Sequence, residues 1–240
     1  MRKLYEKKEI LFAVLWIVAY CVIMSMLKEQ FGYASLWMFL GLAAFAAGIA
    51  AFVKANRLEE KYGLNGFPKD MKRYLFFIPM FILATGNIWD GFALSFKGTE
   101  LAIATLSMIL VGFVEEMIFR GLLFKAMLGN GKAVWAIIIS ALTFGVGHII
   151  NLFTGQATFD TIIQVIFAIG WGFILTMAFY KSGSLIPCII AHSMIDAIAL
   201  YGADTDLGSQ IYIGVTILVA ALYSIYLAKL HLQGCPGDAS

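Results

Sequence analysis

Three groups of ionisable side chains interrupt long apolar stretches of this sequence. They are Glu115, Glu116 and Arg120, then His148, then His192 and Asp196. Placing an ionisable group within a bilayer costs several kcal/mol, so such residues usually mark a site of function. Carboxylates and imidazoles are also the groups that take up and return protons during hydrolysis. The sequence therefore predicts a hydrolytic site assembled from these three groups.

Helical spacing separates the roles of the two glutamates. Glu116 and Arg120 are four residues apart, so they share a helix face and are expected to form a structural ion pair. Glu115 lies about 100° further round the helix. It is therefore expected to be the base that takes a proton from water, with His148 as its partner. The alternative is that Glu115 and His148 form only a buried packing hydrogen bond.

The elements that would carry these residues are membrane-spanning helices. Of the 240 residues, 61% are hydrophobic and 13% charged, whereas soluble domains are nearer half apolar and a quarter charged. A helix needs roughly 20 apolar residues to cross a bilayer, and runs of that order recur along the chain. We predict an all-α, polytopic transmembrane bundle of about eight helices, over residues 10–27, 34–53, 74–88, 101–128, 133–153, 161–180, 185–201 and 211–228.

The basic residues indicate how the bundle crosses the membrane. With the N-terminus in the cytoplasm, fourteen lysines and arginines lie inside, Lys28 and Lys97 lie outside, and Arg120 lies within the fourth span. This positive-inside bias predicts an even number of spans, with both termini cytoplasmic. The first apolar run ends without a small-residue cleavage site, so it is expected to stay in the protein. No repeat or soluble domain is visible, and residues 1–240 are predicted to form a single membrane domain.

The fourth and fifth predicted helices form a hairpin that brings two of the polar groups level. Residues 129–132, Gly-Asn-Gly-Lys, join them in a turn of residues that tolerate positive φ. Glu115 precedes this turn by about as many residues as His148 follows it. At 1.5 Å per residue, each lies on the order of 20 Å from the turn. We therefore expect both side chains at a similar depth.

Three motifs in chain order carry a family resemblance. They are Glu115-Glu116-x-x-x-Arg120, Phe144-x-x-x-His148 and His192-x-x-x-Asp196. The arrangement resembles the CPBP intramembrane proteases, which include the type II CAAX prenyl endopeptidases and the bacterial Abi proteins. The resemblance covers about residues 101–201, the predicted catalytic core. It implies that Glu115 and His148 position and activate the attacking water, while His192 and residue 196 stabilise the tetrahedral oxyanion.

Residue 196 departs from the family pattern. The family commonly has asparagine there, whereas this chain has Asp196. An ionised aspartate would repel an oxyanion. Asp196 is therefore expected either to be protonated or to orient and charge His192, four residues earlier. The alternative is that His192 and Asp196 form a local pair on one helix and take no part in a reaction.

The residues leave the part played by a metal open. Glu115, His148 and His192 supply one carboxylate and two imidazoles, a set that binds catalytic zinc with one position left for water. No HExxH pair is present, so three helices would have to supply the ligands. The cysteines lack CxxC spacing and predict neither a thiolate metal site nor a disulfide framework. A metal-free site fits equally well, and we favour it because Asp196 and Arg120 already supply partners.

Together, the motifs and the resemblance imply an intramembrane endopeptidase, in a bacterial cell membrane, that cleaves near the cytoplasmic side of the bilayer. The expected partners are membrane lipid and a membrane-associated substrate, either a prenylated protein or a bacteriocin-like peptide precursor. No nucleic-acid partner is expected. One alternative is a transporter or proton relay that uses the same Glu, His and Asp side chains. Another is a non-catalytic immunity protein of the same fold.

Overall fold

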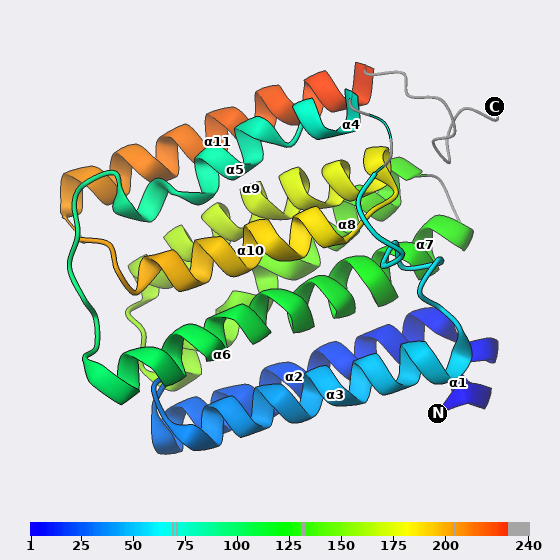
Figure 1. The fold of residues 1–240 in the computed structure, drawn as a ribbon, viewed down its shortest axis with the longest axis horizontal. Coiled ribbons are helices and arrows are strands. Elements are labelled where there is room, and N and C mark those ends of the chain that lie inside the picture. The colour runs from blue at the N-terminus through cyan, green and yellow to red at the C-terminus, as the bar shows by residue number, and fades with distance from the viewer. Residues whose placement is uncertain (69, 71, 131–132, 204, 230–240) are drawn as a thin grey trace.

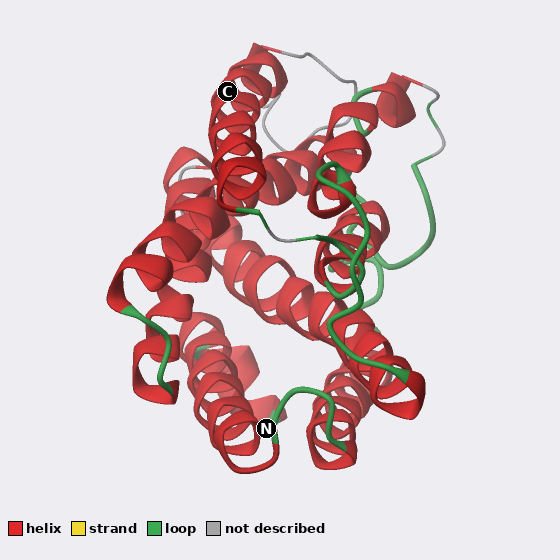
Figure 2. Ribbon diagram, turned by 90° about the vertical axis from the view of Figure 1, so that its left-hand side faces the viewer, coloured by secondary structure: helices red, strands yellow, loops and turns green. Residues whose placement is uncertain are grey.

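The protein is a bundle of helices that share one long axis (Figure 1). The computed structural model describes residues 1–229 apart from 69, 71, 131, 132 and 204. The α-helices are α1 (Arg2–Lys7), α2 (Glu9–Phe31), α3 (Leu36–Asn56), α4 (Lys72–Leu75), α5 (Ile78–Ala84), α6 (Gly98–Glu116), α7 (Lys125–Asn130), α8 (Ala133–Gly147), α9 (Thr158–Ser182), α10 (Ile186–Ala199) and α11 (Asp206–Lys229). Loops join them, and no strand is drawn over the described residues (Figure 2). The predicted all-α class is confirmed.

Three described segments are helical but not α-helical. Two are 3₁₀-helices, η1 (Gly86–Ile88) and η3 (His148–Thr154). The third is a π-helix, η2 (Met117–Phe124), which continues α6 into α7. Both η2 and η3 begin directly beside predicted site residues.

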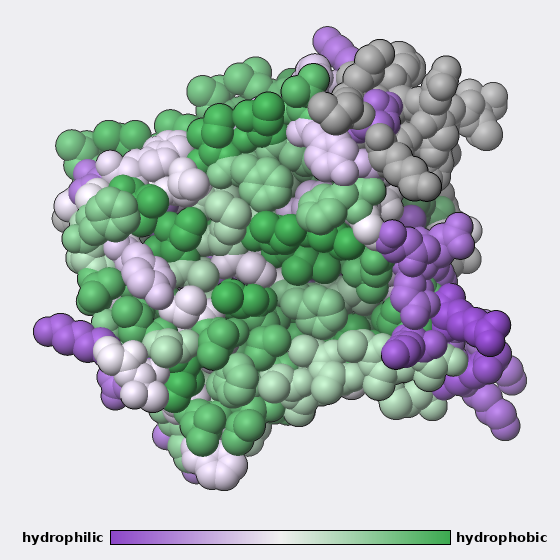
Figure 3. Space-filling view, viewed as in Figure 1, coloured by the Kyte–Doolittle hydropathy of each residue, from purple (hydrophilic) through white to green (hydrophobic). Residues whose placement is uncertain are grey.

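Among the described residues, six helices are long and apolar enough to cross a membrane. They are Glu9–Phe31, Leu36–Asn56, Gly98–Gly129, Ala133–Phe153, Thr158–Ser182 and Leu207–Lys229. Large apolar side chains such as Val18, Trp37 and Leu222 are exposed on them. Figure 3 shows hydrophobic residues along the flank of the molecule, as a lipid-facing surface requires. The polytopic membrane bundle is confirmed.

Two of the eight predicted spans are shorter than expected. The segment 74–88 is divided among α4, α5 and η1, and the seventh span is the 14-residue helix α10. Pro79 and Pro187 each lie in the first turn of their helix. Proline is tolerated there because its missing N–H has no partner in that turn, but it cannot continue a preceding helix. Hydropathy alone does not detect these breaks.

The packing places α6 at the centre of the candidate site. α6 contacts α3 on one side and α10 on the other, α8 packs against α9, and α9 packs against α11. The helix α2 lies beside α3 and contacts η2 (Figure 1). Helices from both halves of the chain therefore surround the end of α6.

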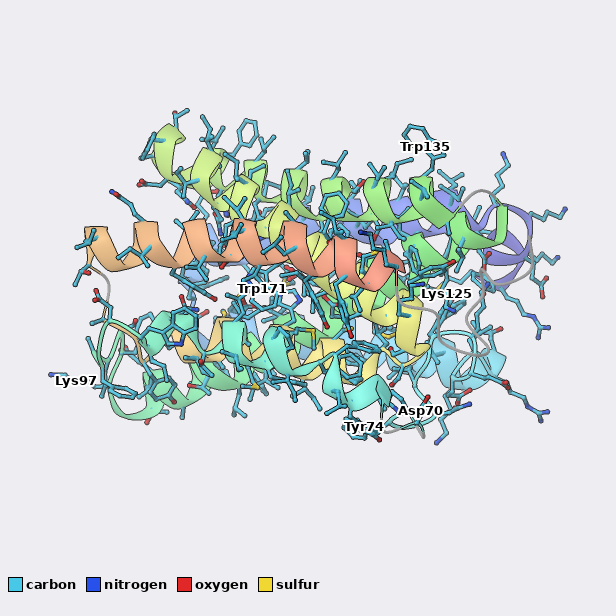
Figure 4. All side chains as sticks on the ribbon, turned by 90° about the horizontal axis from the view of Figure 1, so that it is seen from above. Asp70, Tyr74, Lys97, Lys125, Trp135 and Trp171 are labelled. Atoms are coloured by element: carbon cyan, nitrogen blue, oxygen red, sulfur yellow. The ribbon has the colours of Figure 1, made fainter. Side chains whose placement is uncertain are left out.

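The two ends of the bundle differ in the number of hydrophilic residues they carry (Figure 3). Lys125 lies at one end and Lys97 at the other (Figure 4). The chain begins at the Lys125 end, α11 finishes there, and hydrophilic residues gather there (Figures 1 and 3). We call this the basic end and the other the Lys97 end. The cytoplasmic position of the basic end stays a prediction, and residues 131 and 132 of the predicted hairpin turn lie outside the described residues.

Candidate active site

The site is built on the junction between α6 and the π-helix η2. Glu115 and Glu116 are the last residues of α6, and every residue of η2 is buried. Arg120, within η2, donates from Nη1 to Glu116 Oε1 at 2.7 Å, and both side chains are 0% exposed. The same guanidinium contacts Thr176 Oγ1 at 3.3 Å and the Gly172 carbonyl at 3.4 Å, both on α9. Arg120 thus ties the end of α6 to α9.

Glu116 also accepts a hydrogen bond from His192. The distance from His192 Nδ1 to Glu116 Oε1 is 2.8 Å. Because a carboxylate accepts, Nδ1 carries the proton, and Nε2 is the ring atom available for chemistry. Helical spacing predicts only the contact of Glu116 with Arg120. In the structure, Glu116 also bonds to His192, which lies on a second helix, α10.

The other two carboxylates lie near His192 Nε2. Glu115 Oε2 is 3.7 Å from this atom and Asp196 Oδ2 is 3.5 Å from it. Glu115, Asp196, His192 and His148 all line one cavity of about 230 Å³. The three groups of ionisable residues are therefore brought together.

His148 lies at the end of its helix, where α8 changes to η3 after Gly147. Its Nδ1 is 3.2 Å from the Phe144 carbonyl, which can only accept, so Nε2 is left as an acceptor. Among the described side chains, no hydrogen bond or ion pair joins His148 to Glu115. The two face one cavity, so a water or substrate group would lie between them.

Phe144 forms the common wall of the site. Its ring meets the rings of His148 and His192 edge to face, each at a centroid distance of 5.4 Å. The Arg120 guanidinium lies over the same ring, 4.2 Å from its centroid. Phe144 lies four residues before His148, so both are on one face of the helix. In the structure it also supports His192 and covers Arg120.

A residue that the sequence reasoning missed holds Glu115 in place. The Tyr20 hydroxyl, from α2, donates to Glu115 Oε1 at 2.8 Å, and the Tyr20 side chain is buried. The signal in the sequence is slight: a tyrosine in the middle of an apolar span, whereas tyrosines of membrane helices favour the interfaces. Tyr20 leaves Oε2 of Glu115 as the oxygen nearer His192 Nε2.

The three residues that could have formed a zinc set are not gathered into a ligand cluster. Within the described part of the chain, no three His, Cys, Asp or Glu side chains are placed to hold a metal ion. Glu115, His148 and His192 share a cavity, but Glu115 and His192 are engaged with Tyr20 and Glu116. The residues as placed do not fit a preformed zinc site.

Comparison with known proteins bears on the segment that holds the site. Residues 97–198 match a family described as type II CAAX prenyl endopeptidase Rce1-like. Comparison with curated proteins gives no match. The matched segment contains all three motifs, whereas Tyr20 and the rest of α2 precede it. This is a protease family, and the match confirms the resemblance drawn from the motifs. Over residues 97–198, less than half of its length, the chain is similar to the type II CAAX prenyl endopeptidases.

Proposed function

We propose that this protein is an intramembrane endopeptidase in which Glu115 and His148 activate the attacking water. The observation that carries the proposal is the approach of Glu115 Oε2 to His192 Nε2, at 3.7 Å, in a cavity that His148 also lines. A cavity of about 230 Å³ has room for several waters. The match of residues 97–198 to a protease family supports the same reaction class.

Glu115 is the proton carrier in this proposal. Tyr20 holds Oε1, so Oε2 takes the proton from water as the oxygen attacks the peptide carbonyl carbon. His148 Nε2 accepts the second hydrogen of the water and fixes its direction. Glu115 then returns its proton to the leaving amine, and the C–N bond breaks. Atoms balance as one water adds across one peptide bond.

His192 stabilises the tetrahedral oxyanion. This role needs a proton on Nε2 in addition to the one that Nδ1 donates to Glu116. The carboxylates of Glu115, Glu116 and Asp196 supply the negative charge that balances an imidazolium. The short approach of Asp196 to Nε2 supports a role in orienting and charging His192 rather than in binding the oxyanion itself.

The substrate is a membrane-associated protein or peptide. The family's name refers to prenylated CAAX proteins, and the alternative is an unprenylated precursor such as a bacteriocin-like peptide. Cleavage of a farnesylated CAAX peptide is compared with cleavage of the same peptide without its farnesyl group. The comparison shows whether the substrate must be prenylated. We expect purified protein to cleave at least one of them, with the cleavage position read by mass spectrometry.

Two substitutions test the mechanism. Glu115→Gln and His148→Ala should each lower cleavage between about 10² and 10⁴-fold, the usual contribution of a general base. Glu100→Gln removes an exposed carboxylate from the same helix α6 and should leave cleavage unchanged. Wild-type activity in Glu115→Gln would overturn the assignment. Proton flux driven by a pH gradient, without cleavage, would favour the relay instead.

Metal content is measured on the same samples. We propose a metal-free reaction, so cleavage should survive chelator, and purified protein should hold no stoichiometric zinc. Loss of activity with chelator and its return with zinc would contradict this part of the proposal while leaving the peptidase activity in place.

A further inference from the structure

The cavity at the candidate active site has a basic residue at its far end. Its wall follows α2 from Tyr20 through Met24 and Ser25 to Lys28. Lys28 is half-buried and lies near the end of α2, at the Lys97 end of the bundle (Figure 1). The same cavity therefore has carboxylates around His192 and an ammonium group towards its other end.

Side chains from two other elements hold the Lys28 ammonium. Nζ donates to Asn151 Oδ1, on η3, at 3.2 Å. Asn151 Nδ2 in turn donates to Gln164 Oε1, on α9, at 2.8 Å. The ammonium also lies 4.6 Å from the centre of the Tyr33 ring. A lysine that merely extends to the membrane surface keeps its ammonium in water, whereas Lys28 is fixed by neutral groups of the cavity wall.

No carboxylate of the described residues forms an ion pair with Lys28. Its ammonium has three N–H donors, of which one is directed to Asn151. A partly buried cation gains most from a ligand that brings the opposite charge and accepts a hydrogen bond. The carboxylates of Glu115 and Asp196 would repel such a ligand from the other part of the cavity. The charge distribution favours an anion at Lys28.

We propose that Lys28 binds a carboxylate of the peptide substrate, three to four residues from the bond that is cleaved. The inference rests on the proposed peptidase function and names the group that its cavity recognises. Tyr20 and Lys28 are eight residues apart on α2, which is about 12 Å at 1.5 Å per residue. An extended peptide covers that distance in three to four residues. The carboxylate is a free C-terminus or an acidic side chain at that position.

Binding to a variant that does not cleave provides the test. In Glu115→Gln protein, the affinity for the farnesylated CAAX peptide is measured with a free C-terminus, with a C-terminal amide, and as the amide with glutamate as its last residue. The first or the third peptide should bind roughly tenfold more tightly than the plain amide, as expected for one charge-assisted hydrogen bond. The first identifies a C-terminal carboxylate and the third an acidic side chain.

Variants at Lys28 then assign the preference to this residue. In the Glu115→Gln protein, Lys28→Met should remove the preference for the peptide with a carboxylate, and Lys28→Arg should keep it. Lys97→Met, which removes an exposed charge at the same end, should leave it intact. Equal or absent binding of all three peptides, or a preference that survives Lys28→Met, would overturn the proposal. A preference without any cleavage by the wild type would overturn the peptidase function and leave the carboxylate site standing.

Discussion

Tyr20 restricts the candidate base to one orientation. Its hydroxyl occupies Oε1 of Glu115 at 2.8 Å, which leaves Oε2 near His192 Nε2. The loss of a hydrogen bond to a charged group costs about 1.5–3 kcal/mol. Because the bond acts on the orientation of the base, its loss should affect the chemical step more than substrate binding.

Tyr20→Phe tests this positioning role. We expect kcat for peptide cleavage to fall roughly tenfold with KM unchanged, since the ring stays and only the hydroxyl is removed. Tyr226→Phe, at an exposed position on α11, should match the wild type. In the Glu115→Gln background, removal of the Tyr20 hydroxyl should have little further effect. A rise in KM alone would show that Tyr20 contacts substrate instead.

The buried Glu116–Arg120 pair and the exposed Arg2–Glu6 pair share one spacing but differ in environment. Both are four residues apart, and only the first is fully buried. Arg120→Leu should lower the free energy of unfolding in detergent by about 3–5 kcal/mol, because the buried Glu116 carboxylate loses its guanidinium partner and keeps only His192 among the described residues. Arg2→Leu should change it by less than about 1 kcal/mol. Equal losses, measured by thermal or denaturant unfolding, would contradict the assignment.

At the scale of single residues, the sequence predicts what local spacing determines. The Glu116–Arg120 pair follows from helical spacing, and the membership of Glu115, His148, His192 and Asp196 in one site follows from their polarity within apolar runs. The contacts of Tyr20 with Glu115 and of His192 with Glu116 join positions 95 and 76 residues apart. No rule of spacing connects such positions in a single sequence.

Among the elements, the irregular helices lie where the chemistry is expected. The chain changes from α to π after Glu116 and from α to 3₁₀ at His148. Such changes of helical pitch are frequent at functional sites because they redirect side chains without ending the helix. Hydropathy predicts the long helices well, since it depends on length and composition. It does not distinguish a π-turn from an α-turn, because hydropathy carries no information on which backbone groups are hydrogen-bonded.

Gly112 permits the close approach of α6 and α10. A Cβ at this position would lie 2.8 Å from the Ser193 Cα, next to His192. Gly112→Ala should therefore displace α10 from Glu115 and abolish most cleavage. Gly129→Ala, further along the same span, meets nothing within 4 Å and should have little effect. Normal cleavage in Gly112→Ala would show that α10 can shift without consequence for His192.

For the whole molecule, the cavity and the basic end lie on different sides of the site. Lys28, Asn151 and Gln164, which line the cavity, belong to the Lys97 end of their elements. If the basic end is cytoplasmic, as the charge bias predicts, the cavity leads towards the opposite face of the membrane. Entry from that face would differ from the cytoplasmic cleavage that the sequence suggests.

Cysteine labelling in intact cells checks this orientation. In a background without Cys21, Cys188 and Cys235, Ser25→Cys should react with a membrane-impermeant maleimide added outside, because Ser25 lines the cavity. Lys7→Cys, exposed at the basic end, should react only after the cells are opened. The reverse pattern would place the cavity on the cytoplasmic side. The count of basic residues predicts the outcome, whereas the depth of the cavity cannot be obtained from composition.

The helix that donates the Tyr20 hydroxyl also faces lipid. Residues such as Val14, Val18 and Val22 are exposed on α2, and its 23 residues extend roughly 34 Å, close to the thickness of a bilayer's hydrocarbon core. A change in membrane thickness would alter the tilt of this helix and move the phenol relative to its acceptor oxygen. Catalytic rate in reconstituted vesicles should therefore vary with acyl-chain length, making the surrounding lipid a regulator of the reaction.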